Sequence, residues 1–151
     1  MKKKESKPNQ IVFLGTGGAR VVVFKQIRAS GGIWFSIDGT EFLLDPGPGS
    51  LIKSLEKGLK PKNLEGIILS HRHLDHSADI NVMIEAMTEG GFAKKGVLFA
   101  PRDALEEDPV IFKYVRNYLD KVEIIKAGKK YRIGNVAFEA PVKHVHGNAE
   151  T

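Results

Sequence analysis

All five histidines of the chain lie in two short clusters, and an aspartate accompanies the first cluster. The clustered residues are His71, His73, Asp75 and His76 in the first group, and His144 and His146 in the second. Neutral imidazole and carboxylate groups are ligands of zinc, and iron or manganese becomes an alternative as the carboxylate content rises. A single histidine is more often structural than metal-bound, but this density of ligand types predicts a divalent metal site.

The chain contains no cysteine, so the chemistry of this site must come from other residue types. A cysteine-free sequence excludes a disulfide scaffold, thiolate metal ligands, an iron–sulfur cluster and a cysteine nucleophile. Ser70 and Ser77 flank the first cluster, but a loop or helix N-cap role is the commoner one for serines in such places. We therefore expect histidine and carboxylate groups to carry the function.

Both clusters lie at the ends of predicted strands. The first comes after the hydrophobic run at residues 67–69, where a buried strand gives way to a helix. Ligands of α/β proteins bind outside the carboxyl ends of such strands, and a tight loop there can turn several side chains inward. His144 and His146 lie two residues apart near the end of a predicted strand over residues 136–146, so they share one face.

The hydrophobic pattern predicts an antiparallel meander followed by alternating strands and helices. Expected strands lie at residues 11–14, 21–24, 33–37, 42–44, 66–70, 97–100, 122–125, 131–133 and 136–146. Three helices are expected: one begins at about Ser50, the second begins at about Ser77, and the third spans residues 110–119. Asp38–Gly39 predicts a type I′ hairpin turn. The second helix should present one apolar face made of Ile80, Met83, Ile84 and Met87. This order of elements predicts an α/β fold with a mixed sheet and helices on its outer face.

The glycine-rich segment at residues 15–20 is a weaker signal. It has the look of a dinucleotide-binding loop, but Arg20 stands where the last glycine would be, and a strand rather than a helix is expected after it. We therefore expect an ordinary glycine-rich turn at this position.

Three segments together resemble a known superfamily. His71-Arg72-His73-Leu74-Asp75-His76 resembles the His-x-His-x-Asp-His signature of the metallo-β-lactamase-fold superfamily. Residues 11–18 resemble the opening strand and turn of its ribonuclease Z-like and related hydrolase branches, and residues 42–49 resemble its second motif, an aspartate followed by a glycine turn. The resemblance covers residues 11–146. It implies the metallo-β-lactamase-like αββα architecture and metal-assisted hydrolysis.

The resemblance also implies a role for each residue of the first cluster. His71 and His73 would be two ligands of the first metal. Asp75 and His76 would face the second metal, and Asp75 would act in catalysis by orienting the attacking water or by holding that metal.

The same resemblance implies two further roles. The third ligand of the first metal is a histidine from a later strand, and His146 is preferred over the alternative, His144, because it lies closer to residues 147–151, which resemble the segment after the family's ligand. Asp45 would lie beneath the loop and orient it through hydrogen bonds without touching the metal.

The chain departs from the family in length. Members usually have two αββα-like halves, and the second half supplies a bridging aspartate and a last histidine. The sequence ends at Thr151, just after the third motif, so we expect a flexible basic tail at residues 1–9 and the N-terminal half of a domain at residues 10–151. We expect one or two zinc ions, with manganese or iron as alternatives, and little or no activity from this chain alone. The alternative is a metal-binding half-domain without turnover.

A half-domain with helices on one side only would leave an apolar sheet face in water. We therefore expect a homodimer or a complementing second half-domain to cover that face. Phosphodiester hydrolysis, as by a nuclease, fits the ribonuclease Z-like opening and the basic tail slightly better than amide or thioester hydrolysis.

Positive charge is concentrated at the start of the chain. The sequence has 23 Lys and Arg against 18 Asp and Glu, a formal net charge of +5, and the first nine residues supply +3 of it through four lysines and one glutamate. A solvated tail explains such a run more often than nucleic-acid binding does, so a nucleic-acid partner gains modest support. No apolar run approaches the ~20 residues of a membrane span and no secretory signal is visible, so we expect a cytoplasmic protein without membrane association.

Overall fold

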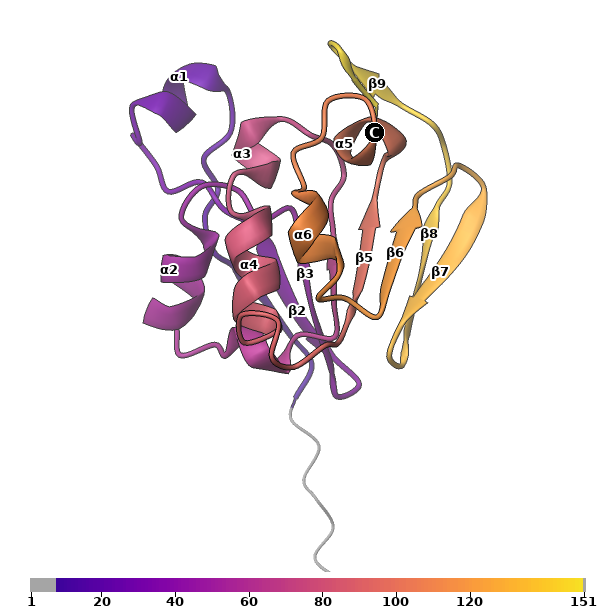
Figure 1. Ribbon diagram of the computed structural model, residues 1–151. Coiled ribbons are helices and arrows are strands. Elements are labelled where there is room, and N and C mark those ends of the chain that lie inside the picture. The colour runs from indigo at the N-terminus through magenta and orange to yellow at the C-terminus, as the bar shows by residue number, and fades with distance from the viewer. Residues whose placement is uncertain (1–7, 151) are drawn as a thin grey trace, which may run out of the picture.

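The computed structural model describes residues 8–150, so most of the predicted tail at residues 1–9 lies outside the described residues (Figure 1). A six-stranded sheet forms the centre, in the order β1-β2-β3-β4-β5-β6. Its strands are β1 (Gln10–Phe13), β2 (Ile33–Ile37), β3 (Thr40–Leu44), β4 (Gly66–Ile68), β5 (Val97–Ala100) and β6 (Lys121–Ile124). The first three strands pair antiparallel and β3 to β6 run parallel. The predicted mixed sheet is confirmed.

The turn between β2 and β3 has the predicted form. Asp38 and Gly39 both have positive φ, 49° and 80°, as a type I′ turn requires. This turn sets a register in which Trp34 lies opposite Leu43 and Phe35 opposite Phe42, so that alternate residues face opposite layers.

Helices cover one face of the sheet, with α2, α4 and α6 in front of it in Figure 1. The helices are α1 (Arg20–Phe24), α2 (Ser50–Glu56), the 3₁₀ turn η1 (Pro61–Asn63), α3 (Leu74–Ser77), α4 (Ile80–Met87), α5 (Arg102–Leu105) and α6 (Lys113–Arg116). The apolar face predicted for α4 is confirmed, because Ile80, Met83, Ile84 and Met87 are all fully buried in the main core. No helix within residues 8–150 has both the length and the apolar composition needed to cross a membrane.

A hairpin of β7 (Lys129–Ile133) and β8 (Val136–Ala140) packs on the other face of the sheet. Phe42 and Phe99 of the sheet form a second core there with Tyr131 and Ile133 of the hairpin. The Phe99 ring meets the rings of Tyr131 and Phe138 edge to face, at centroid distances of 5.3 and 5.1 Å. The expectation that this face lacks any cover within the chain is therefore wrong over β3 and β5.

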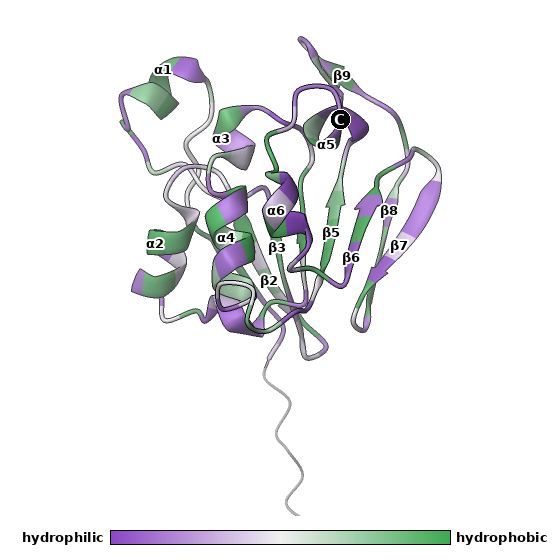
Figure 2. Cartoon of the chain, in the orientation of Figure 1, coloured by the Kyte–Doolittle hydropathy of each residue, from purple (hydrophilic) through white to green (hydrophobic). Residues whose placement is uncertain are grey.

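The cover is incomplete towards β1. Ile11 and Phe13 of this edge strand remain 55% and 56% exposed, although they share the face on which Phe42 and Phe99 are buried. The hairpin itself presents charge outward: Figure 2 shows β7 as largely hydrophilic, and Lys129, Lys130 and Arg132 are its exposed residues.

The tip of the β7–β8 hairpin is fastened to the β2–β3 turn. The Asn135 amide donates to Thr40 Oγ1 at 2.9 Å and its side-chain nitrogen donates to the Asp38 carbonyl at 3.0 Å. Gly134 makes the approach possible, since a Cβ there would lie 2.3 Å from Thr40 Oγ1. These contacts join segments about 95 residues apart.

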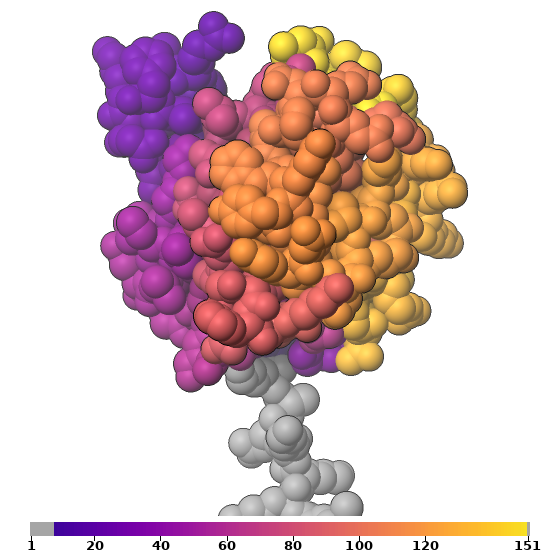
Figure 3. Space-filling view, in the orientation of Figure 1, coloured from indigo at the N-terminus to yellow at the C-terminus, as the bar shows by residue number. Residues whose placement is uncertain are grey.

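The strand predicted at residues 21–24 is instead the short helix α1, so a helix and not a strand follows the glycine-rich turn. The β-branched run Val-Val-Val favours a strand, but the segment has no strand partner within residues 8–150. The backbone bonds locally instead, from Val23 to Ala19 and from Lys25 to Val21. No residue of α1 is buried, and Figure 3 shows this N-terminal lobe standing out from the rest of the molecule.

Two later predictions also need correction. The helix expected over residues 110–119 is reduced to the four residues of α6, because Phe112 at its start has extended backbone, and the equally short α5 was not expected. The strand expected over residues 136–146 ends at Ala140. Pro141 lacks an amide donor and cannot continue the ladder. The chain resumes as a separate small sheet of β9 (Val145–His146) and β10 (Ala149–Glu150).

Candidate metal centre

The loop between β4 and α3 begins at the carboxyl end of a buried parallel strand. Leu69 extends that strand, because its amide donates to the Phe99 carbonyl of β5 at 2.8 Å. At the other end, His73 caps α3 with extended backbone, and Ser77 Oγ donates back to the Arg72 carbonyl at 2.9 Å. Hydrogen bonds thus hold the loop at both ends and fix the direction of the histidines between them.

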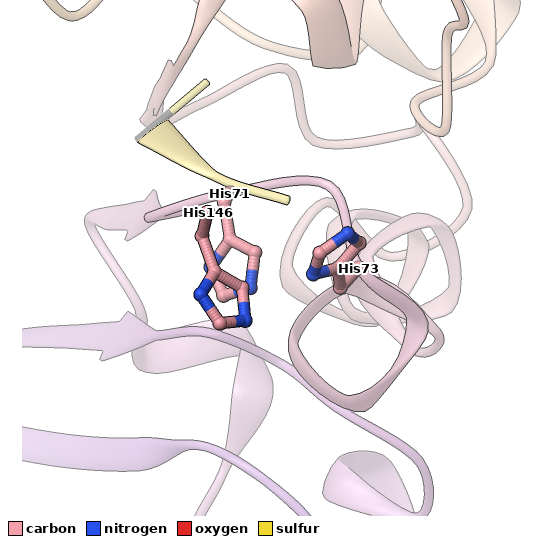
Figure 4. A group of neighbouring side chains, drawn as sticks. All are labelled: His71, His73 and His146. Carbon is pink, nitrogen blue, oxygen red and sulfur yellow. The ribbon is translucent and has the colours of Figure 1, made fainter. Parts of the chain in front are cut away.

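Three histidines converge at this loop (Figure 4). His71 and His73 come from the loop itself and His146 from the end of β9, and one ring nitrogen of each lies within 4.8 Å of the others. The ring centroids are 4.9 Å apart for His71 and His73, 5.5 Å for His71 and His146, and 5.3 Å for His73 and His146. His144 is exposed and outside this group, so the structure brings together the preferred set of the sequence prediction.

Asp45 lies directly after β3 and binds the loop from below. Its carboxylate accepts hydrogen bonds from the Ser70 amide at 2.6 Å and from Ser70 Oγ at 2.7 Å. The same carboxylate lies 2.9 Å from His76 Nδ1, and Ser70 Oγ is 3.0 Å from His71 Nδ1. Asp45 therefore touches the loop through Ser70 and His76, and Ser70 connects it by hydrogen bonds to His71 of the triad.

Asp75 and His76 lie beside the triad. His76 Nε2 is 3.4 Å from Asp75 Oδ2, and the His76 ring centroid is 4.1 Å from that of His71. Their side chains are 27% and 35% exposed, so both are open to solvent on one side. A carboxylate and an imidazole, both groups of the types that bind metals, thus lie next to the three imidazoles without being part of that triad.

The two neighbouring histidines have pKa values shifted in opposite directions. Desolvation, together with the charge of His76, lowers the pKa of His71 to about 4. The hydrogen bond to Asp45 raises the pKa of His76 above its usual value, against the effect of burial. His71 is therefore neutral at physiological pH, which is the form that binds a metal, while His76 is biased towards its charged form.

A cavity of about 280 Å³ adjoins Asp75 and His76. The glycine-rich turn after β1 forms one wall, with Gly15, Thr16, Gly17 and Gly18, and Asp45 contributes to the floor. On the same side Gly47 packs so closely on residues 69–77, called here the motif loop, that a Cβ would lie 2.0 Å from the Asp75 carbonyl oxygen. The glycine-rich segment thus lines the candidate site, a role that sequence reasoning did not assign to it.

Sequence reasoning also missed two residues that hold the centre together. Asn148 Oδ1 lies 3.2 Å from His73 Nε2, and the Asn148 carbonyl accepts a hydrogen bond from Arg72 at 2.9 Å. Both contacts join residues about 75 positions apart, and no local pattern encodes such a pairing.

Three nitrogen donors in this arrangement match the set that binds zinc in catalytic sites, where three protein ligands leave a position open. The neutral, buried His71, the half-buried His73 and the exposed His146 agree with such a site, because one side of the triad is accessible.

Comparison with known proteins gives consistent matches. Residues 40–151 match the family described as Beta-lactamase superfamily domain. An uncharacterized protein of Methanocaldococcus jannaschii is 29% identical over 135 residues, covering 87% of this chain and 51% of the relative. A ribonuclease Z of Kineococcus radiotolerans is 31% identical over 99 residues, covering 66% of this chain and 31% of that enzyme.

The fold has relatives among solved structures. The metallo-beta-lactamase fold protein YhfI from Bacillus subtilis superposes with a TM-score of 0.62 at 23% identity, covering 85% of this chain and 50% of YhfI. At this identity the likeness concerns the fold alone. The chain spans about half the length of these proteins or less.

Proposed function

The chain belongs to the Beta-lactamase superfamily domain family, and on that premise we propose that it carries the first metal site of a zinc-dependent phosphodiester hydrolase. The observation that carries this proposal is the triad of His71, His73 and His146, whose ring nitrogens lie within 4.8 Å of one another. Zinc suits three imidazoles best, and manganese or iron would gain from the nearby carboxylates.

The chain's own residues set up the reaction around the triad. A bound zinc ion supplies Lewis acidity that activates water at neutral pH. His71 is held neutral by burial and so is ready to coordinate without first losing a proton. Asp75 lines the cavity beside His76, and in this proposal it would orient the attacking water or hold a second metal.

Phosphodiesters are the substrate class we favour. The ribonuclease Z enzymes among its relatives serve as a precedent, and a cavity of about 280 Å³ with a glycine-rich wall lies next to Asp75. A nucleic-acid substrate would also agree with the outward lysines and arginine of β7.

A second candidate function is a metal-binding half-domain without turnover. Its support is that only Asp75 and His76 represent the second metal site among residues 8–150. In this proposal residues 10–151 are the N-terminal half of a domain, and the exposed Ile11 and Phe13 mark where a second copy or a complementing half would pack.

Metal analysis and turnover test both candidates. Elemental analysis of the dialysed chain should give about one zinc per chain, His71→Ala should lose it, and His144→Ala should keep it. A chain that stays metal-free in excess zinc would contradict both candidate functions. Hydrolysis of bis-p-nitrophenyl phosphate tests the second candidate: turnover within the ~1–10³ s⁻¹ typical of enzymes would contradict a half-domain without turnover and support the hydrolase.

A further inference from the structure

The small sheet that delivers His146 has little support of its own. Strands β9 and β10 contain two residues each, and Val145 is 62% exposed. They form a sheet separate from the six-stranded one, so no ladder of the main sheet fixes their position. Something else must hold this segment, residues 145–150, called here the His146 hairpin, against the motif loop.

Arg72 reaches from the motif loop to the His146 hairpin. It lies between His71 and His73 in sequence, and its side chain is only 16% exposed. Its Nη2 donates to the Asn148 carbonyl at 2.9 Å, its Nε lies 3.0 Å from Asp103 Oδ2, and its Nη1 pairs with Asp108. One side chain therefore joins the motif loop, helix α5 and the turn of the His146 hairpin.

Asp103 is the second half of this connection. Its side chain is 6% exposed. The carboxylate oxygen that pairs with Arg72 also accepts a hydrogen bond from the backbone amide of Glu150, in the His146 hairpin, at 2.9 Å. Its other oxygen is buried without a hydrogen-bond partner among residues 8–150. Within that range Arg72 is the cation paired with Asp103, so losing Arg72 would leave a buried charge uncompensated.

We propose that Arg72 and Asp103 form a latch that holds the His146 hairpin on the motif loop, and that Arg72 is a positioning residue of the metal centre acting through His146. The latch rests on the contacts of Arg72 and Asp103 alone, and its effect on metal binding rests on the function proposed above. The planar fork of arginine is what the arrangement needs, because three separate groups must be met from one side chain. Lysine carries a single point charge, so it could form the ion pair with Asp103 but could not also hydrogen-bond to the His146 hairpin.

The latch predicts a specific pattern in zinc affinity. Arg72→Met should weaken zinc binding by about 10- to 100-fold, the loss typical of removing an outer-shell partner of a metal ligand. In the double variant with His146→Ala, Arg72→Met should add nothing to the loss caused by His146→Ala alone, because it acts through that residue. The matched control is Arg102→Met, which removes an exposed arginine of α5 that pairs with Glu106 and should leave zinc affinity unchanged. Additive losses would overturn the positioning role.

Hydrogen exchange of the metal-free chain tests the latch independently of any metal. Arg72→Met should speed the exchange of the Ala149 and Glu150 amides while the amides of β4 and β5 stay protected. If Arg72→Met does not fold, Arg72→Lys, which keeps the charge beside Asp103, should show the same selective change. Unchanged exchange in the His146 hairpin would overturn the latch. A wild-type chain without metal would instead overturn the proposed function and leave the exchange result decisive.

Discussion

The motif loop at residues 69–77 and the His146 hairpin at residues 145–150 each contribute to one histidine triad, yet they are built differently. The loop continues a buried parallel strand, is held by Asp45 through Ser70, and leads into α4, whose apolar residues are fully buried. The hairpin is exposed over residues 145–148 and is held from outside by Arg72, His73 and Asp103.

The site thus combines a rigid region, the motif loop, with a region whose position depends on a few contacts, the His146 hairpin, which we call the conditional region. Two donors are fixed by the same packing that stabilises the sheet, and they are in place whenever the domain is folded. The third donor depends on a few polar contacts whose net stabilisation is about 1–3 kcal/mol each, so it can be lost without unfolding the rest. We expect substitutions in the two regions to separate global stability from site assembly.

The largest expected effect is on the buried support of the motif loop. Ile84→Ala removes a fully buried side chain of α4 and should lower the free energy of unfolding by ~2–5 kcal/mol. Val145→Ala in the His146 hairpin, where the side chain is 62% exposed, should change it by less than ~0.5 kcal/mol. Urea unfolding measures both. Equal losses in the two variants would erase the distinction between the regions.

The next effect is a pH dependence that belongs to the buried histidine. The pKa of His71 is lowered to about 4 in the folded, metal-free chain, whereas an unfolded histidine titrates near ~6.5, so the unfolded state binds more protons between these values. The free energy of unfolding therefore suffers no loss from His71 above pH ~6.5, and the titration of His71 lowers it by about 2 kcal/mol on going to pH 5.

His71→Asn should remove that fall, as measured by unfolding at pH 7 and pH 5. The raised pKa of His76 acts in the opposite direction, because its stabilisation is present at low pH and is lost as pH rises through its folded value. His76→Asn should therefore steepen the acid loss rather than relieve it. An identical pH profile for wild type and His71→Asn would show that burial of His71 has no such effect.

A smaller effect is expected from the carboxylate beneath the motif loop. Asp45→Asn keeps the shape and one acceptor oxygen but loses the charge that Ser70 and His76 meet. The loss of charge-assisted hydrogen bonds should cost about 1 kcal/mol. It should also lower the pKa of His76, because the bond to Asp45 is the main cause of its increase, and NMR titration of the His76 ring measures this directly. A pKa of His76 that stays raised would place the cause elsewhere.

The smallest effect should come from the ion pair across the His146 hairpin. Lys143 Nζ lies 2.9 Å from Glu150 Oε1, but the two side chains are 64% and 34% exposed. Lys143→Met should change stability by less than ~1 kcal/mol, and the change should vanish in high salt. Zinc affinity should stay at the wild-type value. A loss comparable to that of Arg72→Met would mean that surface charge, and not the buried latch, holds the hairpin.

Local pattern was enough to predict the rigid region. The spacing of Ile80, Met83, Ile84 and Met87 encodes a helix face, and the short runs of buried residues encode the sheet. The dense histidine cluster after β4 located the candidate site because ligand types and their position at a strand end are both visible in sequence. Its role in binding zinc stays a prediction.

The conditional region could not be predicted in the same way. Arg72 meets Asn148 across 76 positions, and Asp103 meets Glu150 across 47, so their pairing depends on the tertiary fold. The segment at residues 20–24 failed for a related reason. Its β-branched residues favour a strand, but within residues 8–150 no strand edge lies beside it to pair with. Local backbone hydrogen bonds form the helix α1 instead.

The hydrogen bonds between Asn135 and the β2–β3 turn have a consequence for folding during synthesis of the chain. A ribosome adds about 5–20 residues per second, so the tip of the β7–β8 hairpin emerges roughly 5–20 s after its partner Thr40, which lies 95 positions earlier. Throughout that interval Phe42 has emerged without the aromatic side chains that later cover it. Nascent chains of this protein are thus most prone to aggregate, or to need a chaperone, before residues 129–140 have emerged.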